Sequence, residues 1–341
     1  MPTKESHVSR RHRLNFSQLL AASFLSLSFL TVQSGRAHAA GPSQSSLAYQ
    51  KAVAAVKSAT FLKTVPRSTV PTLSSHGKGD YAFILTPKIK WTCIPTKTAT
   101  KFEVCKFGKL GSPTKMVLLG DSQASAWAAG FIKYAELNNI ELTLLAMNSC
   151  PPWHLAISDA NGQPFPSCSK FQSFSQQQIN SIHPQYVAIT GVIPLTTGGV
   201  RPTSNQLSNG ISALIRSIRP SGAKVAVLSN DPMYYSNSIA GPPNCYFDRS
   251  TEIDKCALAP SAIFSSGTSN GILRTALLKA ASDSNVAYLN LEPLLCATTC
   301  PVVIDSYLVY HDAFHVYWTY AEHLALPLGH LLHLAIKAPT Y

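Results

Sequence analysis

The chain has 341 residues, of which 45% are hydrophobic and 13% are charged, and its formal net charge at pH 7 is +12. This length is sufficient for one large domain with an additional segment. The basic residues are dispersed and form no cluster interleaved with aromatic side chains, so we expect no nucleic-acid partner. A dispersed positive charge favours weak attraction to an anionic cell envelope.

Residues 1–39 have the pattern of a secretory signal peptide. Three arginines precede an apolar stretch from Leu19 to Val32, and a small-residue cleavage pattern ends at Ala39. An uncleaved membrane anchor is the alternative, but the apolar stretch is short for crossing a bilayer. The sequence therefore predicts cleavage near Ala39 and a mature protein that is secreted, periplasmic or held in the cell envelope.

Residues 40–90 are rich in Ser, Thr, Pro and Lys, and they predict an N-terminal arm that precedes a catalytic domain at residues 91–341. Apolar residues recur at helical spacing between Ser45 and Thr64, so we expect one amphipathic helix in this arm. Two prolines follow and interrupt the helical pattern.

The eight cysteines fall into four couples that are close in sequence. An even number of cysteines behind a signal peptide favours disulfide bonds formed in an oxidising compartment. A metal site is the alternative, but no couple has the Cys-x2-Cys spacing of zinc ligands. The order of cysteines alone leaves the connectivity open, and closing short loops is the simplest expectation. The pairs expected on that basis are Cys93–Cys105, Cys150–Cys168, Cys245–Cys256 and Cys296–Cys300.

From residue 115 onward, apolar strands alternate with helices. The expected strands are residues 116–119, 141–147, 186–190, 224–229 and 286–291. The expected helices are residues 123–137, 171–182, 206–218, 271–282 and 319–336. Because the strands are continuous apolar runs, they predict a parallel sheet with helices on both faces and ligands at the carboxyl ends of the strands. The polar stretch 233–270 is expected to be an ordered insertion near such a site.

Ser122 lies immediately after the first of these strands, in the stretch VLLGDSQASAW at residues 117–127. A helix N-terminus has free backbone N–H groups and a partial positive charge. A serine at this point can attack a carbonyl while nearby N–H groups stabilise the oxyanion. The alternative is an ordinary helix cap, because Ser after Asp is common at a helix start.

A nucleophilic serine needs a general base, and the base needs a group that orients it. His315 and Asp312 are three residues apart between the fifth strand and the last helix, where the fold would bring them beside Ser122. We therefore expect His315 to accept the serine proton and Asp312 to hold the imidazole. His311, Asp312 and His315 could instead bind a metal, although no HExxH pattern or distant ligand cluster supports that alternative.

The early GDS, the late DxxH and the alternating strands between them resemble the SGNH hydrolase superfamily. The chain is most similar to the periplasmic SGNH domain of acyltransferase-3 type O-acyltransferases. Residues 119–124, LGDSQA, together with Trp127, resemble the family's GDSHA and the tryptophan that follows it, with Gln123 in place of His. Residues 149–152, SCPP, resemble its Cys-Pro-Pro, and residues 300–315 resemble its C-P-V-V-I segment and terminal DxxH.

This resemblance extends from about Cys93 to Leu326 and implies a three-layer α/β/α sandwich with a five-stranded parallel sheet, the flavodoxin-like SGNH fold. It implies Ser122 as nucleophile, His315 as general base and Asp312 as its partner. It also implies an oxyanion hole from the Ser122 N–H and groups after the second and third strands, namely Ser149, Thr190 and Gly191. Two of these positions depart from the family: Ser149 replaces a glycine, and Thr190-Gly191 replaces an asparagine whose side-chain amide is a donor.

The resemblance implies a secreted serine esterase or O-acyltransferase that handles acyl groups, chiefly acetyl, of cell-envelope carbohydrate through an acyl-serine, with no metal or organic cofactor. The fused relatives have an integral membrane domain where this chain has a signal peptide. A separate membrane acyltransferase is therefore an expected partner, unless the protein acts as a free esterase. The alternatives are a non-catalytic module that binds glycan or acyl donor, which the absent asparagine favours, and a purely structural envelope protein.

Overall fold

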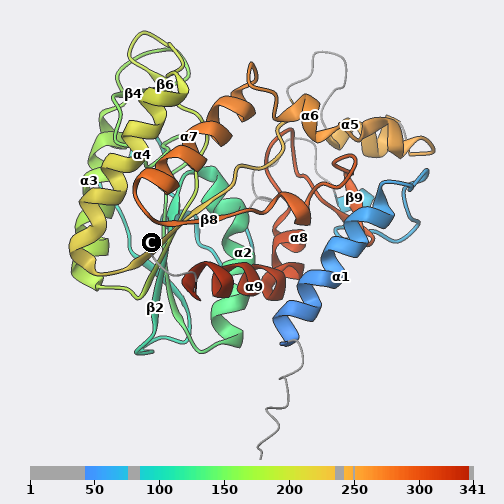
Figure 1. Ribbon diagram of the computed structural model, residues 1–341, viewed down its shortest axis with the longest axis horizontal. Helices are drawn as coiled ribbons and strands as arrows, with labels where there is room; N and C mark the ends of the chain where they lie inside the picture. Colours follow the sequence, from blue (N-terminus) through green and yellow to red (C-terminus); the bar gives the residue numbers. More distant parts are fainter. Residues whose placement is uncertain (1–42, 76–84, 235–241, 249, 338–341) are drawn as a thin grey trace, which may run out of the picture. The chain divides into compact units, whose positions relative to one another are not determined.

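The computed structural model describes residues 43–75, 85–234, 242–248 and 250–337, so the expected signal peptide at residues 1–39 lies outside the described residues. The described residues form one compact unit around a six-stranded sheet (Figure 1). The strands of this sheet, in chain order, are β1 (Cys105–Gly108), β2 (Lys115–Gly120), β3 (Glu141–Ala146), β5 (Tyr186–Ile189), β7 (Lys224–Leu228) and β8 (Ala287–Leu289).

The sheet has the strand order β1-β3-β2-β5-β7-β8. The five strands from β3 to β8 are parallel, and their order is that of the flavodoxin-like folds, which confirms the predicted fold class. The edge strand β1 was not predicted and is antiparallel to β3, with Cys105 opposite Leu144. From β2 the chain first adds β3 on one side and later adds β5 on the other side. The carboxyl ends of β2 and β5 therefore mark the topological switch point, where such folds bind ligands.

Helices cover both faces of the sheet (Figure 1). One face packs against α2 (Ser122–Leu137), α8 (Trp318–His323) and α9 (Ala325–Lys337), and the other against α3 (Pro166–Ile182), α4 (Ser204–Ile218) and α7 (Ser269–Asp283). Alternate residues of β2 serve the two layers: Leu118 belongs to the core beneath α2, and Leu119 to the core beneath α3, α4 and α7. This alternation produces the expected three-layer sandwich.

The N-terminal arm is packed against the rest of the unit. Its helix α1 (Gln44–Ala59) contacts α9, and Val56 is fully buried in the same core as the side chains of α2. The helix ends at Ala59, five residues earlier than the apolar pattern predicts. Within the described residues, no helix is both long and apolar enough to cross a membrane.

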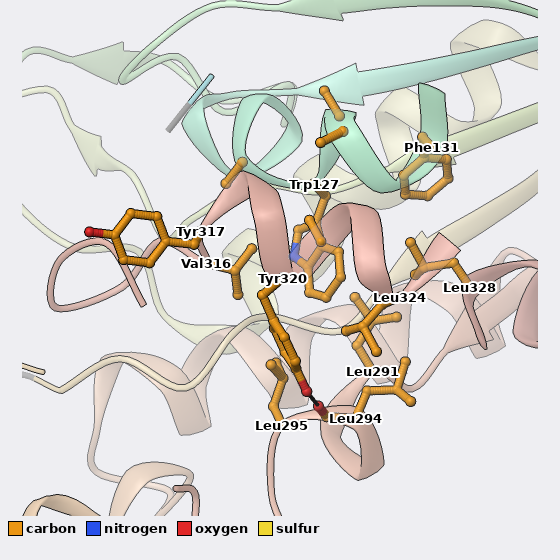
Figure 2. Close-up of a cluster of buried hydrophobic side chains, with 14 of the residues drawn as sticks. Trp127, Phe131, Leu291, Leu294, Leu295, Val316, Tyr317, Tyr320, Leu324 and Leu328 are labelled. Carbon is orange, nitrogen blue, oxygen red and sulfur yellow. Dashed lines mark hydrogen bonds between the residues drawn. The ribbon is translucent and has the colours of Figure 1, made fainter. Parts of the chain in front are cut away.

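The terminal helix predicted at residues 319–336 is two helices, α8 and α9, which are separated at Leu324. Pro327 explains the break, because proline lacks an N–H and is tolerated only in the first turn of a helix. Figure 2 shows Tyr320 of α8 and Leu328 of α9 among the buried side chains near Trp127 of α2. The Tyr320 hydroxyl donates to the Leu294 carbonyl oxygen at 2.7 Å.

Short elements complete the described structure. Two small hairpins are formed by β4 (Ile157–Ser158) with β6 (Leu195–Thr196) and by β9 (Val303–Ile304) with β10 (Tyr307–Leu308). The insertion after β7 contains α5 (Pro242–Asp248) and α6 (Pro260–Ile263). The 3-10 turns are Leu73–Ser75, Trp91–Cys93, Arg219–Ser221, Ile253–Cys256 and Glu292–Leu294. The eight cysteines form four disulfide bonds, in the pairs expected from closing short loops.

Candidate active site

Ser122 is the first residue of α2, at the carboxyl end of β2 and beside the switch point of the sheet. The helix is capped by Asp121, whose Oδ1 accepts the Gln123 backbone N–H at 2.9 Å, so the interpretation of Ser122 as an ordinary cap is wrong. Gly120 permits this sharp turn, because a Cβ there would lie 2.4 Å from the Thr190 carbonyl oxygen. The half-buried serine hydroxyl is therefore available for another partner.

That partner is His315. The distance from Ser122 Oγ to His315 Nε2 is 2.7 Å, and the distance from His315 Nδ1 to Asp312 Oδ2 is also 2.7 Å. Both ring nitrogens of His315 are thus engaged, which leaves neither for the metal site considered from the sequence. With Nδ1 protonated toward the carboxylate, Nε2 is free to accept the serine proton. The geometry is that of a nucleophile, a general base and an orienting acid.

The Asp312 carboxylate is oriented by the backbone of its own loop. Its Oδ1 accepts the N–H groups of Phe314 and His315 at 2.9 and 2.8 Å. Burial tends to raise the pKa of Asp312, but the hydrogen bonds from His311 and His315 outweigh burial, so its net pKa is well below the ordinary value. Asp312 is therefore ionised at neutral pH and can stabilise an imidazolium on His315.

The loop that bears this pair is closed on itself and tied to its surroundings. The His311 N–H donates to the His315 carbonyl oxygen at 2.8 Å. From outside the loop, the Tyr234 N–H donates to the Ala313 carbonyl oxygen at 2.8 Å, and the Gln123 side-chain amide donates to the Phe314 carbonyl oxygen at 2.9 Å. Gln123 thus connects α2 directly to the loop that contains Asp312 and His315.

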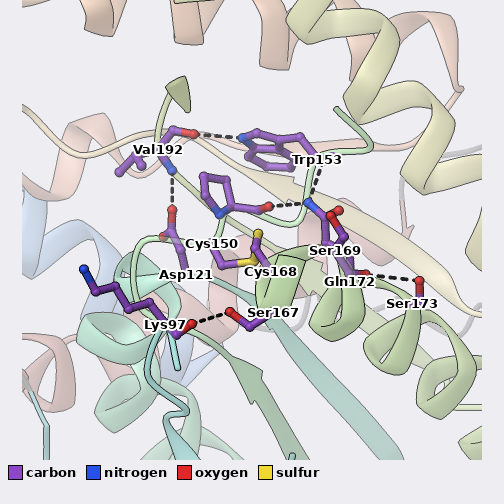
Figure 3. Close-up of a disulfide and its surroundings, with 11 residues drawn as sticks. Lys97, Asp121, Cys150, Trp153, Ser167, Cys168, Ser169, Gln172, Ser173 and Val192 are labelled. Atoms are coloured by element: carbon purple, nitrogen blue, oxygen red, sulfur yellow. Dashed lines mark hydrogen bonds between the residues drawn. A yellow bond between two sulfur atoms is a disulfide. The ribbon is translucent and has the colours of Figure 1, made fainter. Parts of the chain in front are cut away.

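Ser122 opens onto a cavity of about 230 Å³ that Ser149 also lines. Ser149 has a φ of 60°, a left-handed conformation that favours glycine, which agrees with the glycine that relatives have at this position. The next residue, Cys150, is joined to Cys168 of α3, and this disulfide holds the turn against the helix (Figure 3). The remaining lining comes mainly from the β4/β6 hairpin and the segment after β5.

Two of the four residues expected to supply oxyanion donors, Ser122 and Ser149, line this cavity. In the part of the chain that the structure describes, the backbone N–H groups of Ser122 and Ser149 have no hydrogen-bond acceptor. The Thr190 N–H, in contrast, donates to the Leu119 carbonyl oxygen at 3.0 Å, and neither Thr190 nor Gly191 lines the cavity. The structure therefore does not bring the expected donors after the third strand to the site.

The segment after β5 instead supports Asp121. The Val192 N–H donates to Asp121 Oδ2 at 2.8 Å, and the Val192 carbonyl oxygen accepts the Trp153 indole N–H at 2.9 Å (Figure 3). Burial raises the pKa of Asp121, although its backbone hydrogen bonds oppose this rise. The sequence pattern did not reveal this role, because it depends on a contact between residues 71 positions apart.

A second buried acid beneath the site also escaped sequence reasoning. Asp231, three residues after β7, accepts the Trp127 indole N–H at 2.9 Å on Oδ1 and 3.2 Å on Oδ2. Burial raises the pKa of Asp231 to about 7, against the effect of the Trp127 hydrogen bond and with a further contribution from Asp121. Asn230, which could have supplied the absent amide, is buried and donates to the Asn270 carbonyl oxygen at 3.4 Å.

Comparison with known proteins identifies the family of this chain. The sequence model of the family described as "SGNH domain (fused to AT3 domains)" matches residues 92–327, and the chain therefore belongs to this family. No curated protein sequence shows significant similarity to the chain.

Among solved structures, the chain is similar to the periplasmic domain of a lipopolysaccharide acetyltransferase from Salmonella ser. Paratyphi A. The identity is 14% over 66% of this chain and 86% of that domain, with a TM-score of 0.52. Weaker likenesses include a GDSL-like lipase from Bacteroides thetaiotaomicron (11% identity, 66% of this chain, 88% of that chain, TM-score 0.40) and an acetyl xylan esterase (11%, 63%, 98%, 0.39). At such identities the likeness is one of fold, and an acyl-handling enzyme class rests on the family.

Proposed function

We propose that this protein is a serine esterase or O-acyltransferase that acts on acyl groups of cell-envelope carbohydrate. The observation that supports this proposal most strongly is the hydrogen-bonded chain Ser122–His315–Asp312, with 2.7 Å at both contacts. The class of acyl-handling enzymes follows from the family, and the carbohydrate substrate is proposed by analogy with the acetyltransferase and esterase of similar fold.

In the proposed first half-reaction, Ser122 Oγ bonds to the carbonyl carbon of an ester while its proton passes to His315 Nε2. The N–H groups of Ser122 and Ser149 stabilise the oxyanion, and Asp312 stabilises the imidazolium. The intermediate then collapses: the bond from carbonyl carbon to the leaving alcohol breaks, and that alcohol takes the proton from His315. The product is an acyl ester of Ser122.

In the second half-reaction, water or a sugar hydroxyl gives its proton to His315 and attacks the acyl carbon. The bond to Ser122 Oγ breaks, and the serine recovers the proton from His315. Water gives a free acid, so the enzyme is an esterase; a sugar hydroxyl gives a new ester, so it is a transferase. Loss of one oxyanion donor costs roughly 100- to 1,000-fold in rate, so a site with two backbone donors is slower than one with three.

The proposed location is outside the cytoplasm, after removal of residues 1–39. Four disulfide bonds support an oxidising compartment. The family's association with acyltransferase-3 domains supports a separate membrane acyltransferase as the source of acyl groups. Envelope polysaccharide or another acylated glycan is the proposed second substrate.

A non-catalytic binding module is the second candidate, because Thr190 and Gly191 supply no donor to the cavity. Hydrolysis of p-nitrophenyl acetate by the wild type and the Ser122→Ala variant distinguishes the two candidates. Loss of hydrolysis in Ser122→Ala, with unchanged thermal unfolding, supports the enzyme. Equal rates in both proteins would contradict it and leave the binding module.

A further inference from the structure

A second cavity, of about 470 Å³, lies next to the catalytic cavity. The two cavities share Met233 and Ser269 as lining residues, so they meet along these side chains. The described residues that line the second cavity are Met233, Leu258, Ala262, Ile263, Gly267, Thr268, Ser269 and Asn270. Because the catalytic serine lies in one cavity and the other adjoins it, a substrate bound at Ser122 can extend into the second cavity.

Both cavities have walls of mixed chemistry. In the catalytic cavity, Ser158, Asp159 and Arg201 lie among apolar side chains and suit a hydroxyl-rich acceptor. In the second cavity, Thr268, Ser269 and Asn270 form a polar side. Another side of the second cavity is apolar and is formed by Met233, Leu258, Ala262 and Ile263. None of the described residues that line this cavity is charged. An apolar wall favours a hydrocarbon chain, since each methylene removed from water contributes to binding.

The wall of the second cavity is held by several internal contacts. The Thr268 hydroxyl lies 2.7 Å from the Ile263 carbonyl oxygen and 2.8 Å from that of Ser265, and it accepts the Gly271 N–H at 3.0 Å. These bonds fix the turn between α6 and α7. The Cys300 N–H donates to the Leu258 carbonyl oxygen at 2.8 Å, which anchors the opposite end of the wall. The cavity is therefore built into the fold.

We propose that this second cavity is an acyl-chain pocket, and that the acyl groups that this protein handles are longer than acetyl. The inference rests on the proposed function, because the chain enters the pocket from an ester at Ser122. An acetyl group has a single methyl beyond its carbonyl carbon, whereas cavities of this size hold ligands of many atoms. A butanoyl to octanoyl chain passes Met233 and Ser269 and lies against Leu258 and Ile263.

Gly267 offers a direct way to fill the pocket. It lines the cavity, and a Cβ at this position meets no atom within 4 Å, so a larger side chain is accommodated without a backbone clash. Gly267→Phe occupies the space proposed for the acyl chain, and Gly267→Ala is the matched control for the change in backbone freedom. Gly267→Phe is therefore expected to impair hydrolysis of long-chain esters more than hydrolysis of an acetyl ester, which does not extend into the pocket.

The test compares p-nitrophenyl acetate, butanoate and hexanoate. Each buried methylene is worth up to roughly fourfold in kcat/KM, so the four additional methylenes of hexanoate should favour it over acetate by up to roughly 250-fold in the wild type and in Gly267→Ala. In Gly267→Phe this preference should disappear, because the kcat/KM for hexanoate falls more than the kcat/KM for acetate. A wild type that favours acetate, or a preference for hexanoate that survives in Gly267→Phe, would overturn the proposal.

Calorimetric titration with hexanoate separates this proposal from the proposed function, because binding needs no turnover. If the wild type hydrolyses none of the esters but binds hexanoate, and Gly267→Phe does not, the pocket is supported while the esterase reaction fails. Equal binding by both proteins, or no binding by either, contradicts the pocket. If Gly267→Phe lost the binding of a free sugar but kept the binding of hexanoate, the proposal would also be contradicted, because the second cavity would then bind the acceptor.

Discussion

Replacement of Asp231 by Asn should remove a pH-dependent loss of stability. The Asp231 side chain is 1% exposed and burial raises its pKa from 3.8 to about 7. The folded protein therefore keeps a proton that the unfolded chain releases near pH 4. Stability from this group is fully present below the unfolded pKa and is lost as pH rises toward 7. The slope is at most about 1.4 kcal/mol per pH unit and falls as Asp231 ionises near pH 7, so the wild type loses roughly 2–3 kcal/mol from this carboxyl between pH 5 and pH 7.

Urea unfolding at pH 5, 6, 7 and 8 measures this loss. Asn keeps an oxygen for the Trp127 indole N–H but cannot ionise, so the difference in unfolding free energy between variant and wild type should grow by about 2–3 kcal/mol from pH 5 to pH 7. Above pH 7 this difference should level off, because Asp231 of the wild type is then ionised in the folded protein as well as in the unfolded chain. Asp283→Asn, at an exposed position, controls for the change in net charge. Parallel pH profiles for wild type and Asp231→Asn would refute the assignment of a buried, proton-binding carboxyl.

The remaining predictions concern the site and its supports. His315→Asn and Asp312→Asn should each lower kcat for p-nitrophenyl acetate by roughly 1,000-fold or more, because the base or its orientation is lost. Gln123→Leu removes the amide that donates to the Phe314 carbonyl, so kcat should fall about tenfold with little change in KM, and Gln123→His should recover part of it. The paired change Cys150→Ser with Cys168→Ser should lower the unfolding free energy by about 3 kcal/mol in urea titrations, since it opens an 18-residue loop. Unchanged values in any of these assays would contradict the role given to that group.

The parallel core of the fold was predictable because its strands bury both faces. Each reads as a continuous apolar run, as in residues 116–119, and each is followed by a helical pattern. The edge strand β1 has only four residues and a mixed composition, so its pairing with β3 depends on tertiary context. Pro327 indicates the break between α8 and α9. The break was not predicted because apolar residues continue at helical spacing on both sides of this proline.

The proximity of Ser122, Asp312 and His315 was predictable because the motifs that contain them are local. GDS marks the end of a strand, and Asp312 and His315 are only three positions apart. The supports of the site are not local: Val192 reaches Asp121 across 71 positions, and Asp231 reaches Trp127 across 104. No short pattern encodes such pairs, since each depends on the packing of separate strands. Oxyanion donors were expected at Thr190 and Gly191, but the Thr190 N–H instead donates to the Leu119 carbonyl oxygen at the end of the strand.

The central claim is that Ser122 is a nucleophile that His315 activates. Incubation of the folded protein with a fluorophosphonate, followed by intact-protein and peptide mass spectrometry, tests this claim most directly. We expect one phosphonyl group on the peptide that contains Ser122 in the wild type, much slower labelling in His315→Asn, and none in Ser122→Ala. An unlabelled wild type, or equal labelling of wild type and Ser122→Ala, would contradict the account.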